Sequence, residues 1–153
     1  AEELAKLPTY YIMELDKGMA ETVAAHMPSA DEIAACRWLP DDELRVYSAE
    51  FERTGFQGGL QWYRCRTGGI GRAELEVFAG LTIDVPLIFI AGASDWGVYQ
   101  TPGSLQRMQE TCTQMLGCHL IDGAGHWVQQ EQPKRVSELL LGFLAAGQNR
   151  ALE

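Results

Sequence analysis

An aspartate and a histidine in two separate loops could work as an acid–base pair. Asp95 follows one apolar segment of the sequence, and His126 follows another. If these segments are neighbouring parallel strands, both loops lie at one sheet edge, where a carboxylate can orient an imidazole that removes a proton. By residue type alone, such an aspartate is usually a helix cap and such a histidine a turn residue. Asp84 and Asp122 remain alternative acids.

A nucleophile does not accompany this pair. A Ser, Cys or Asp nucleophile on a strand-to-helix elbow needs small residues two positions before and two positions after it. Gly92 precedes Ser94 at that spacing, but Trp96 follows it, so we expect Ser94 to be a turn hydroxyl. Gly69 and Gly71 lack the third glycine and the preceding strand that a dinucleotide site requires.

Alternating strand and helix patterns after residue 85 would position the two loops. Residues 86–91 form a continuous apolar run, typical of a strand buried on both faces, and residues 118–121 predict a second strand. Apolar side chains recur at helical spacing over residues 105–115, and residues 136–144 carry an apolar helical stripe that we expect to lie on the sheet. This order predicts a parallel α/β sheet with right-handed crossovers.

Two strands make an incomplete sheet, because each leaves one edge without a hydrogen-bonding partner. We therefore expect further strands from an absent N-terminal half or from a second copy of the chain, as in a dimer. The first residue is alanine rather than methionine, which also leads us to expect a piece of a longer protein.

The first part of the chain predicts short helices instead of strands. Apolar residues recur at helical spacing between residues 18 and 66, and prolines and a glycine separate the helices. Three glycines within residues 67–72 predict a hinge loop. The chain is therefore divided into a helical segment (1–66), the hinge (67–72), an α/β segment (73–150) and an expected tag scar (151–153).

Composition limits the class of protein. The 153 residues include 21 acidic and 12 basic side chains, and the net charge of −9 disfavours nucleic acid and membrane surfaces as partners. The longest apolar run, Val85 to Ala93, is far shorter than the roughly 20 residues of a membrane span. The cysteines form no CxxC pair and no metal-type cluster with histidine, so we expect a reduced, cytoplasmic protein without metal or cofactor.

Three blocks of the sequence closely resemble soluble epoxide hydrolases of the α/β-hydrolase superfamily. They are Gly55-Phe-x-Gly-x-Leu-x-Trp-Tyr-Arg64, Pro86 to Asp95, and Gly123-Ala-Gly-His-Trp127. Their order and spacing match the second half of that family, and the first block is the most specific. The resemblance implies a partial α/β-hydrolase fold, in which a helical lid precedes a two-strand parallel β-α-β-α piece of a larger sheet.

The resemblance also implies roles for individual residues. Asp95 matches the triad acid, and His126 matches the base that activates water. Tyr63 and Tyr10, or Tyr11 in a shifted register, match lid tyrosines that hydrogen-bond the epoxide oxygen. We further expect four aromatic side chains to bind substrate: Trp62, Trp96, Trp127 and Phe56.

In this family an aspartate opens the epoxide by forming an alkyl-enzyme ester, which water hydrolyses to a diol. That aspartate belongs to the N-terminal half of such enzymes, so this chain contains no matching nucleophile. We expect the chain alone to be inactive and its substrate to be a small epoxide.

Two alternative functions remain open from the sequence. A haloalkane or fluoroacetate dehalogenase uses the same acid–base logic but stabilises a halide with indole or amide N–H groups. The two phenols favour the epoxide hydrolase, because an alkoxide needs a proton and a halide does not. The other alternative is a non-catalytic α/β-hydrolase fragment that associates through its open sheet edge.

Overall fold

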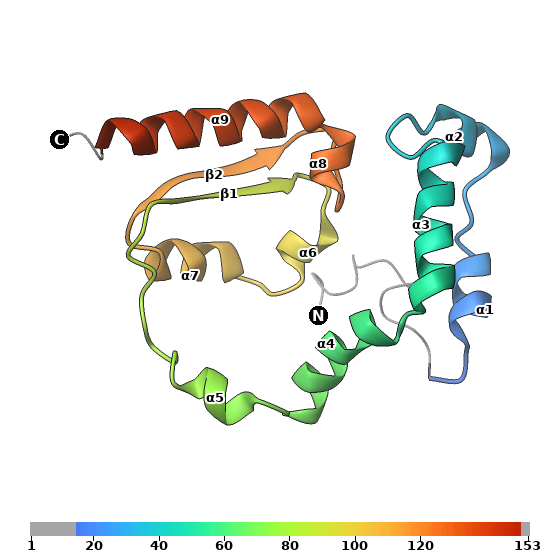
Figure 1. The fold of residues 1–153 in the computed structure, drawn as a ribbon, viewed down its shortest axis with the longest axis horizontal. Helices are drawn as coiled ribbons and strands as arrows, with labels where there is room; N and C mark the ends of the chain where they lie inside the picture. Colours follow the sequence, from blue (N-terminus) through green and yellow to red (C-terminus); the bar gives the residue numbers. More distant parts are fainter. Residues whose placement is uncertain (1–14, 151–153) are drawn as a thin grey trace. The chain divides into compact units, whose positions relative to one another are not determined.

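The computed structural model describes residues 15–150 of the chain (Figure 1). Contacts divide the chain into two units: the first comprises Ala1–Cys36 and Thr82–Glu153, and the second comprises Arg37–Leu81. The division into segments 1–66, 67–72 and 73–150, and the tag scar at 151–153, stay sequence-based predictions with bounds of their own. No helix among residues 15–150 combines the length and the apolar character needed to cross a bilayer.

The first unit contains a parallel pair of strands. Its elements in chain order are α1 (Met19–Ala24), α2 (Ala30–Ala35), β1 (Leu87–Gly92), α6 (Trp96–Tyr99), α7 (Ser104–Thr111), β2 (Met115–Ile121), α8 (Val128–Glu131) and α9 (Pro133–Arg150). The register pairs Leu87 with Met115 at one end and Gly92 with Ile121 at the other. The predicted two-strand parallel sheet of a partial α/β fold is therefore confirmed.

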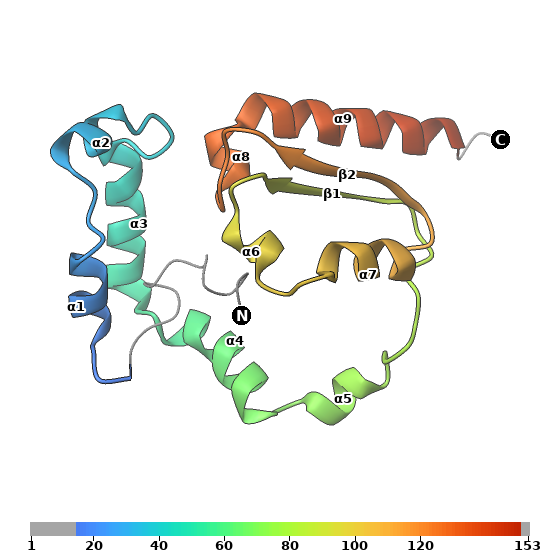
Figure 2. The same ribbon diagram turned by 180° about the vertical axis from the view of Figure 1, so that it is seen from behind.

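Helices flank the strand pair on two sides. Figure 1 shows α9 along one side and α6 and α7 on the other, and Figure 2 shows the same arrangement from behind. A helical connection of this kind is what two adjacent parallel strands require, since a tight hairpin cannot join them.

The predicted helix over residues 105–115 is too long. Helix α7 ends at Thr111, and Met115 begins β2. Cys112 caps the helix with φ −95° and ψ 88°, is buried, and pairs across an isolated bridge with Ile83. The helical spacing of apolar residues continues past the end of α7 to Met115. Spacing alone therefore does not mark where a helix ends and a strand begins.

The core lies at the carboxyl end of the strands. Ile121, Ala124 and Val128 are buried together, and Ile90 of β1 packs against them. From α9, Val136 and Leu139 join this cluster, so the predicted apolar stripe does lie on the sheet at its N-terminal end. Its later members, Leu140 and Leu144, are exposed.

Just before β1, Asp84 forms hydrogen bonds with the turn that precedes β2. The Asp84 carboxylate accepts hydrogen bonds from Thr113 Oγ1 at 2.6 Å and from Thr82 Oγ1 at 3.0 Å. The side-chain amide of Gln114 donates to the Asp84 carbonyl at 2.6 Å. The Thr113 bond, followed by the Thr82 bond, lowers the pKa of Asp84 below its ordinary value of 3.8.

We predict that Asp84 makes the chain less stable in acid. Its pKa is lower in the folded chain than in the unfolded chain, so the stabilisation is fully present above the unfolded pKa and is lost as pH falls through the folded pKa. The free energy of unfolding of the native chain, measured in urea, should therefore fall from pH 5 toward pH 3. Asp84→Asn should make this fall with pH less steep. Thr113→Val should also make the pH dependence less steep. An unchanged slope in both variants would contradict this role.

The second unit contains three helices: α3 (Asp41–Thr54), α4 (Gln57–Gly68) and α5 (Arg72–Glu76). Three acidic residues occupy the first turn of α3, where they complement the helix dipole. Gly55 and Gly69 follow α3 and α4 with φ of 67° and 69°, a backbone region that favours glycine. Thr67 and Gly68, which the sequence places in the predicted hinge loop, belong to the last turn of α4.

Candidate active site

Asp95 and His126 meet where the two strands end. Residues 93–95, which follow β1, are called the acid loop, and residues 122–127, which follow β2, are called the base loop. His126 Nδ1 lies 3.1 Å from Asp95 Oδ1. The same carboxylate oxygen accepts a 2.8 Å hydrogen bond from the Gly97 amide, since Asp95 is also the N-cap of α6. The helix-cap role and the contact with histidine therefore coexist in one side chain.

This contact assigns the tautomer of His126. An ionised carboxylate only accepts hydrogen bonds, so in the neutral imidazole Nδ1 carries the proton and Nε2 keeps its lone pair. The Asp95 side chain is 13% exposed, whereas that of His126 is 51% exposed. The acid is thus shielded behind the imidazole, while much of the imidazole remains open to a reactant. Such an arrangement can orient a base and stabilise its protonated form.

Two indoles contact the imidazole. The Trp96 ring stacks on the His126 ring at a centroid distance of 5.4 Å and an interplanar angle of 16°. The Trp127 ring meets it edge-on, at 5.5 Å and 78°. These contacts restrict rotation of the ring and supply apolar surface beside the imidazole.

The acid and base loops are joined through their backbones. The Ala93 amide donates to Ile121 O at 2.9 Å, and the Ser94 amide donates to Ala124 O at 3.0 Å. A Cβ atom on Gly92 would stand 2.2 Å from Gly125 O and 2.3 Å from Ala124 O. Only glycine permits this approach of the two loops at position 92.

A carboxylate that the sequence reasoning missed holds the base loop. Glu131 Oε2 accepts a 2.8 Å hydrogen bond from the Gly125 amide, and Oε1 accepts a 3.0 Å bond from the Trp127 amide. The available signal was an acidic residue one helical turn after a glycine-rich turn, a spacing that resembles helix capping. The pattern does not reveal that the same carboxylate reaches back to residue 125.

The alternative acids lie elsewhere. Asp84 precedes β1, so it belongs to the opposite end of the strand pair from His126. Asp122 directly follows β2 and is exposed. Ser94 uses its backbone amide to hold the base loop. Of the described carboxylates, Asp95 is the one with a hydrogen bond to His126.

The first unit therefore brings Asp95, Trp96, His126 and Trp127 together. The other predicted residues, Phe56, Trp62 and Tyr63, belong to the second unit, where Phe56 caps α4 and the other two lie on it. All three are exposed in the chain, and Phe56 stacks on Phe51 at 4.6 Å. Tyr10 and its alternative Tyr11 lie outside the described residues.

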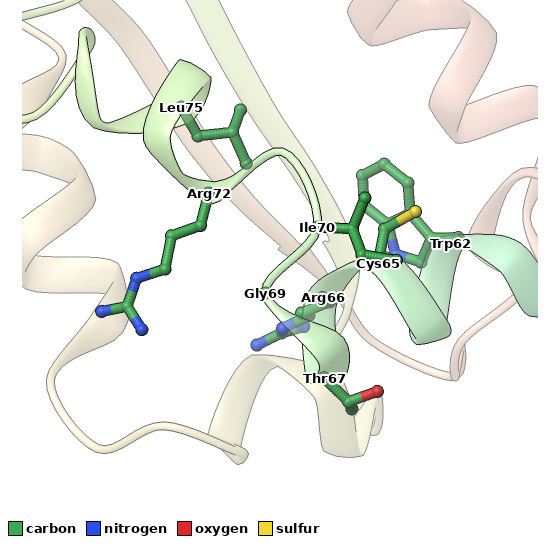
Figure 3. A pocket seen from close by; sticks show the side chains of 8 residues that line it. All are labelled: Trp62, Cys65, Arg66, Thr67, Gly69, Ile70, Arg72 and Leu75. Atoms are coloured by element: carbon green, nitrogen blue, oxygen red, sulfur yellow. The ribbon is translucent and has the colours of Figure 1, made fainter.

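A pocket of about 510 Å³ lies between α4 and α5 in the second unit (Figure 3). Trp62, Cys65 and Ile70 provide apolar surface, and Arg66 and Arg72 also line it. Tyr63 is not among its lining residues. Within residues 15–150, no group of three or more His, Cys, Asp or Glu side chains could hold a metal ion.

Comparison with known proteins finds epoxide hydrolases. Epoxide hydrolase A of Mycobacterium tuberculosis is 45% identical over 108 residues, which are 70% of this chain and 32% of that protein. Epoxide hydrolase B of the same species is 35% identical over 107 residues, which cover 70% and 30% of the two chains. The chain thus spans about a third of the length of these relatives. No family model matches it.

Solved structures agree with the sequence matches. Epoxide hydrolase A from Mycobacterium thermoresistibile matches with a TM-score of 0.63 and 42% identity, over 72% of this chain and 33% of that one. Potato epoxide hydrolase I matches with a TM-score of 0.69 over 95% of this chain and 49% of that one; at 24% identity this likeness concerns the fold. By sequence and by structure, this chain is therefore similar to one part of epoxide hydrolases of the α/β-hydrolase fold.

Proposed function

We propose that this chain supplies the water-activating pair and the lid of an epoxide hydrolase. The observation that carries the proposal is the 3.1 Å contact between His126 Nδ1 and Asp95 Oδ1, at the strand ends of a chain related to epoxide hydrolases. It leaves Nε2 available to a water molecule on the open side of the ring. A small epoxide is the proposed substrate.

The reaction has two covalent stages. A carboxylate from a segment outside this chain attacks a ring carbon of the epoxide, the C–O bond breaks, and an alkyl-enzyme ester forms. Tyr63 and Tyr10 donate hydrogen bonds to the departing oxygen, and one phenol gives it a proton. His126 Nε2 then takes a proton from water as the water oxygen attacks the ester carbonyl. The tetrahedral intermediate then breaks its C–O bond to the alkyl group, and the departing alkoxide takes the second proton of the water, so that the diol leaves and the carboxylate is restored. The proton on the imidazole returns to the phenolate through solvent.

The proposed partner is the N-terminal half of the same protein. Among the described residues the sheet has two strands, so each has an outer edge without a strand partner. The chain also spans only about a third of the relatives' length. A further strand would satisfy the unpaired backbone groups of an edge, and the missing half would bring the nucleophile. Pairing with a second copy of the chain is the competing outcome.

A substrate assay tests the proposal. The 153-residue chain would be supplied with a styrene-oxide-type epoxide and, separately, with a short haloalkane, both alone and after addition of the proposed N-terminal half. We expect diol formation only when both halves are present. Halide release without a diol would replace this proposal with a dehalogenase. A stable dimer of the chain that does not bind the N-terminal half would support a non-catalytic fragment.

Replacement of Tyr63 by phenylalanine should slow ring opening in the reconstituted protein. Removing one donor to a developing oxyanion typically reduces the rate roughly 100-fold, while an exposed phenol contributes little to folding. Stopped-flow measurement of ester formation would detect the change, with Tyr47→Phe on α3 as the matched control. Equal rates for Tyr63→Phe and the native protein would show that the phenol does not contact the epoxide oxygen.

A further inference from the structure

Glu131 binds the backbone on both sides of His126. Its two carboxylate oxygens accept hydrogen bonds from the amides of Gly125 and Trp127, at 2.8 Å and 3.0 Å. The side chain is half-buried against the base loop. Hydrogen bonds to an ionised acceptor are stronger than neutral ones, and two from one planar group fix the relative positions of both donors.

Helix capping accounts for only one of these two bonds. Trp127 is the N-cap residue of α8, so the bond from its amide to Glu131 closes the first turn of that helix. Gly125 precedes the cap, and its bond to Glu131 spans six residues. A carboxylate that merely stabilised α8 would not need to reach the glycine before the histidine.

The Gly125 bond also acts where the acid and base loops touch. Gly125 O faces Gly92, and the neighbouring Ala124 O accepts the Ser94 amide of the acid loop. Any movement of the backbone at residues 124–127 would therefore change the Nδ1–Oδ1 distance between His126 and Asp95. The His126 side chain is half exposed, so the contacts with Trp96 and Trp127 cover only part of the ring.

We propose that Glu131 is a positioning residue that sets the direction of the His126 imidazole toward Asp95. This inference rests on the proposed function, since it concerns the same water-activating pair. Glu131 acts through the backbone of the base loop and does not touch the reacting atoms. Its loss should therefore affect the step that His126 carries out and leave ester formation unchanged.

The first test is NMR of the complete chain labelled with ¹⁵N. In the native chain the His126 ring should show the Nδ1–H tautomer, and the amides of Gly125 and Trp127 should exchange slowly. In Glu131→Ala those amides should exchange at least about tenfold faster, and the ring should become a mixture of tautomers. Glu131→Gln keeps one acceptor oxygen, so it should lie between the two. Glu138→Gln, which removes an equal charge from α9, should behave as the native chain.

The second test separates the two chemical stages in the reconstituted protein by single-turnover kinetics. Glu131→Gln and Glu131→Ala should form the ester at the native rate and hydrolyse it roughly 10- to 100-fold more slowly, because the base is misaligned. An unchanged tautomer in Glu131→Gln together with native ester hydrolysis would overturn the inference, and so would equal slowing of both stages. If the native pair of halves makes no diol, the proposed function fails, and the tautomer measurement still decides the role of Glu131.

Discussion

Replacement of His126 by alanine should leave the reconstituted protein with an ester that forms but does not break. The attacking carboxylate and the phenols act before His126, so ring opening should proceed at the native rate. In the native chain the His126 imidazole lies 3.1 Å from the Asp95 carboxylate. Without this base, hydrolysis of the ester should slow by roughly 10²- to 10⁴-fold. Intact-protein mass spectrometry should then show an adduct with the full mass of the epoxide, because ring opening releases no atoms.

The matched control is a histidine of the same unit outside the base loop. His119 lies within β2, so His119→Ala should turn over epoxide and accumulate no adduct. An absence of adduct in His126→Ala under single-turnover conditions would remove His126 from the hydrolysis step. An equal adduct in His119→Ala would show that the ester persists for reasons unrelated to the Asp95–His126 pair.

Replacement of Gly92 by alanine should strongly destabilise the first unit. The new Cβ would stand 2.2 Å from Gly125 O and 2.3 Å from Ala124 O, and both are backbone atoms that cannot rotate away. The acid and base loops would have to separate, which would break the Ser94–Ala124 hydrogen bond. We expect a loss of about 3 kcal/mol in the free energy of unfolding.

Urea denaturation of the chain measures this loss, and Gly142→Ala is the matched control. Gly142 lies in α9 with open space around its Cβ direction, so alanine there should stabilise the helix by about 0.5–1 kcal/mol. A Gly92→Ala chain as stable as the native one would mean that the loops are less closely apposed than the distances indicate. If it also kept the Nδ1–H tautomer of His126, Gly92 would have no part in holding the pair.

Much of the architecture was predictable from local pattern. The apolar run that became β1 is continuous, and the stripe of α9 repeats at helical spacing, because burial of a strand or a helix face leaves a short-range signature. The fold class and the family were also readable, since three blocks of residue types and spacings occur together. The roles of Asp95, His126, Tyr63, Tyr10 and the aromatic residues stay predictions.

Boundaries were less predictable, because neighbouring elements compete for the same apolar residues. Met115 repeats at helical spacing with Cys112, yet its backbone pairs with Leu87 in the sheet. The glycine-rich composition around Thr67 predicts a hinge, but Thr67 lies in α4, where its hydroxyl donates to the Tyr63 carbonyl. For Met115, pairing with another strand overrides the helical spacing.

The residue order was enough to identify the strand ends and to place an acid and a base in the loops beyond them. It could not show that Gly92 lies against the backbone of residues 124 and 125, or that Glu131 accepts hydrogen bonds from the amides on both sides of His126. Those contacts depend on which backbone atoms come together in space. The residue types alone do not determine them, because glycine and glutamate occur in many other surroundings. The folded chain alone decides them, because close approach of the two loops selects glycine at 92 and folding brings the Glu131 carboxylate to the amides of Gly125 and Trp127.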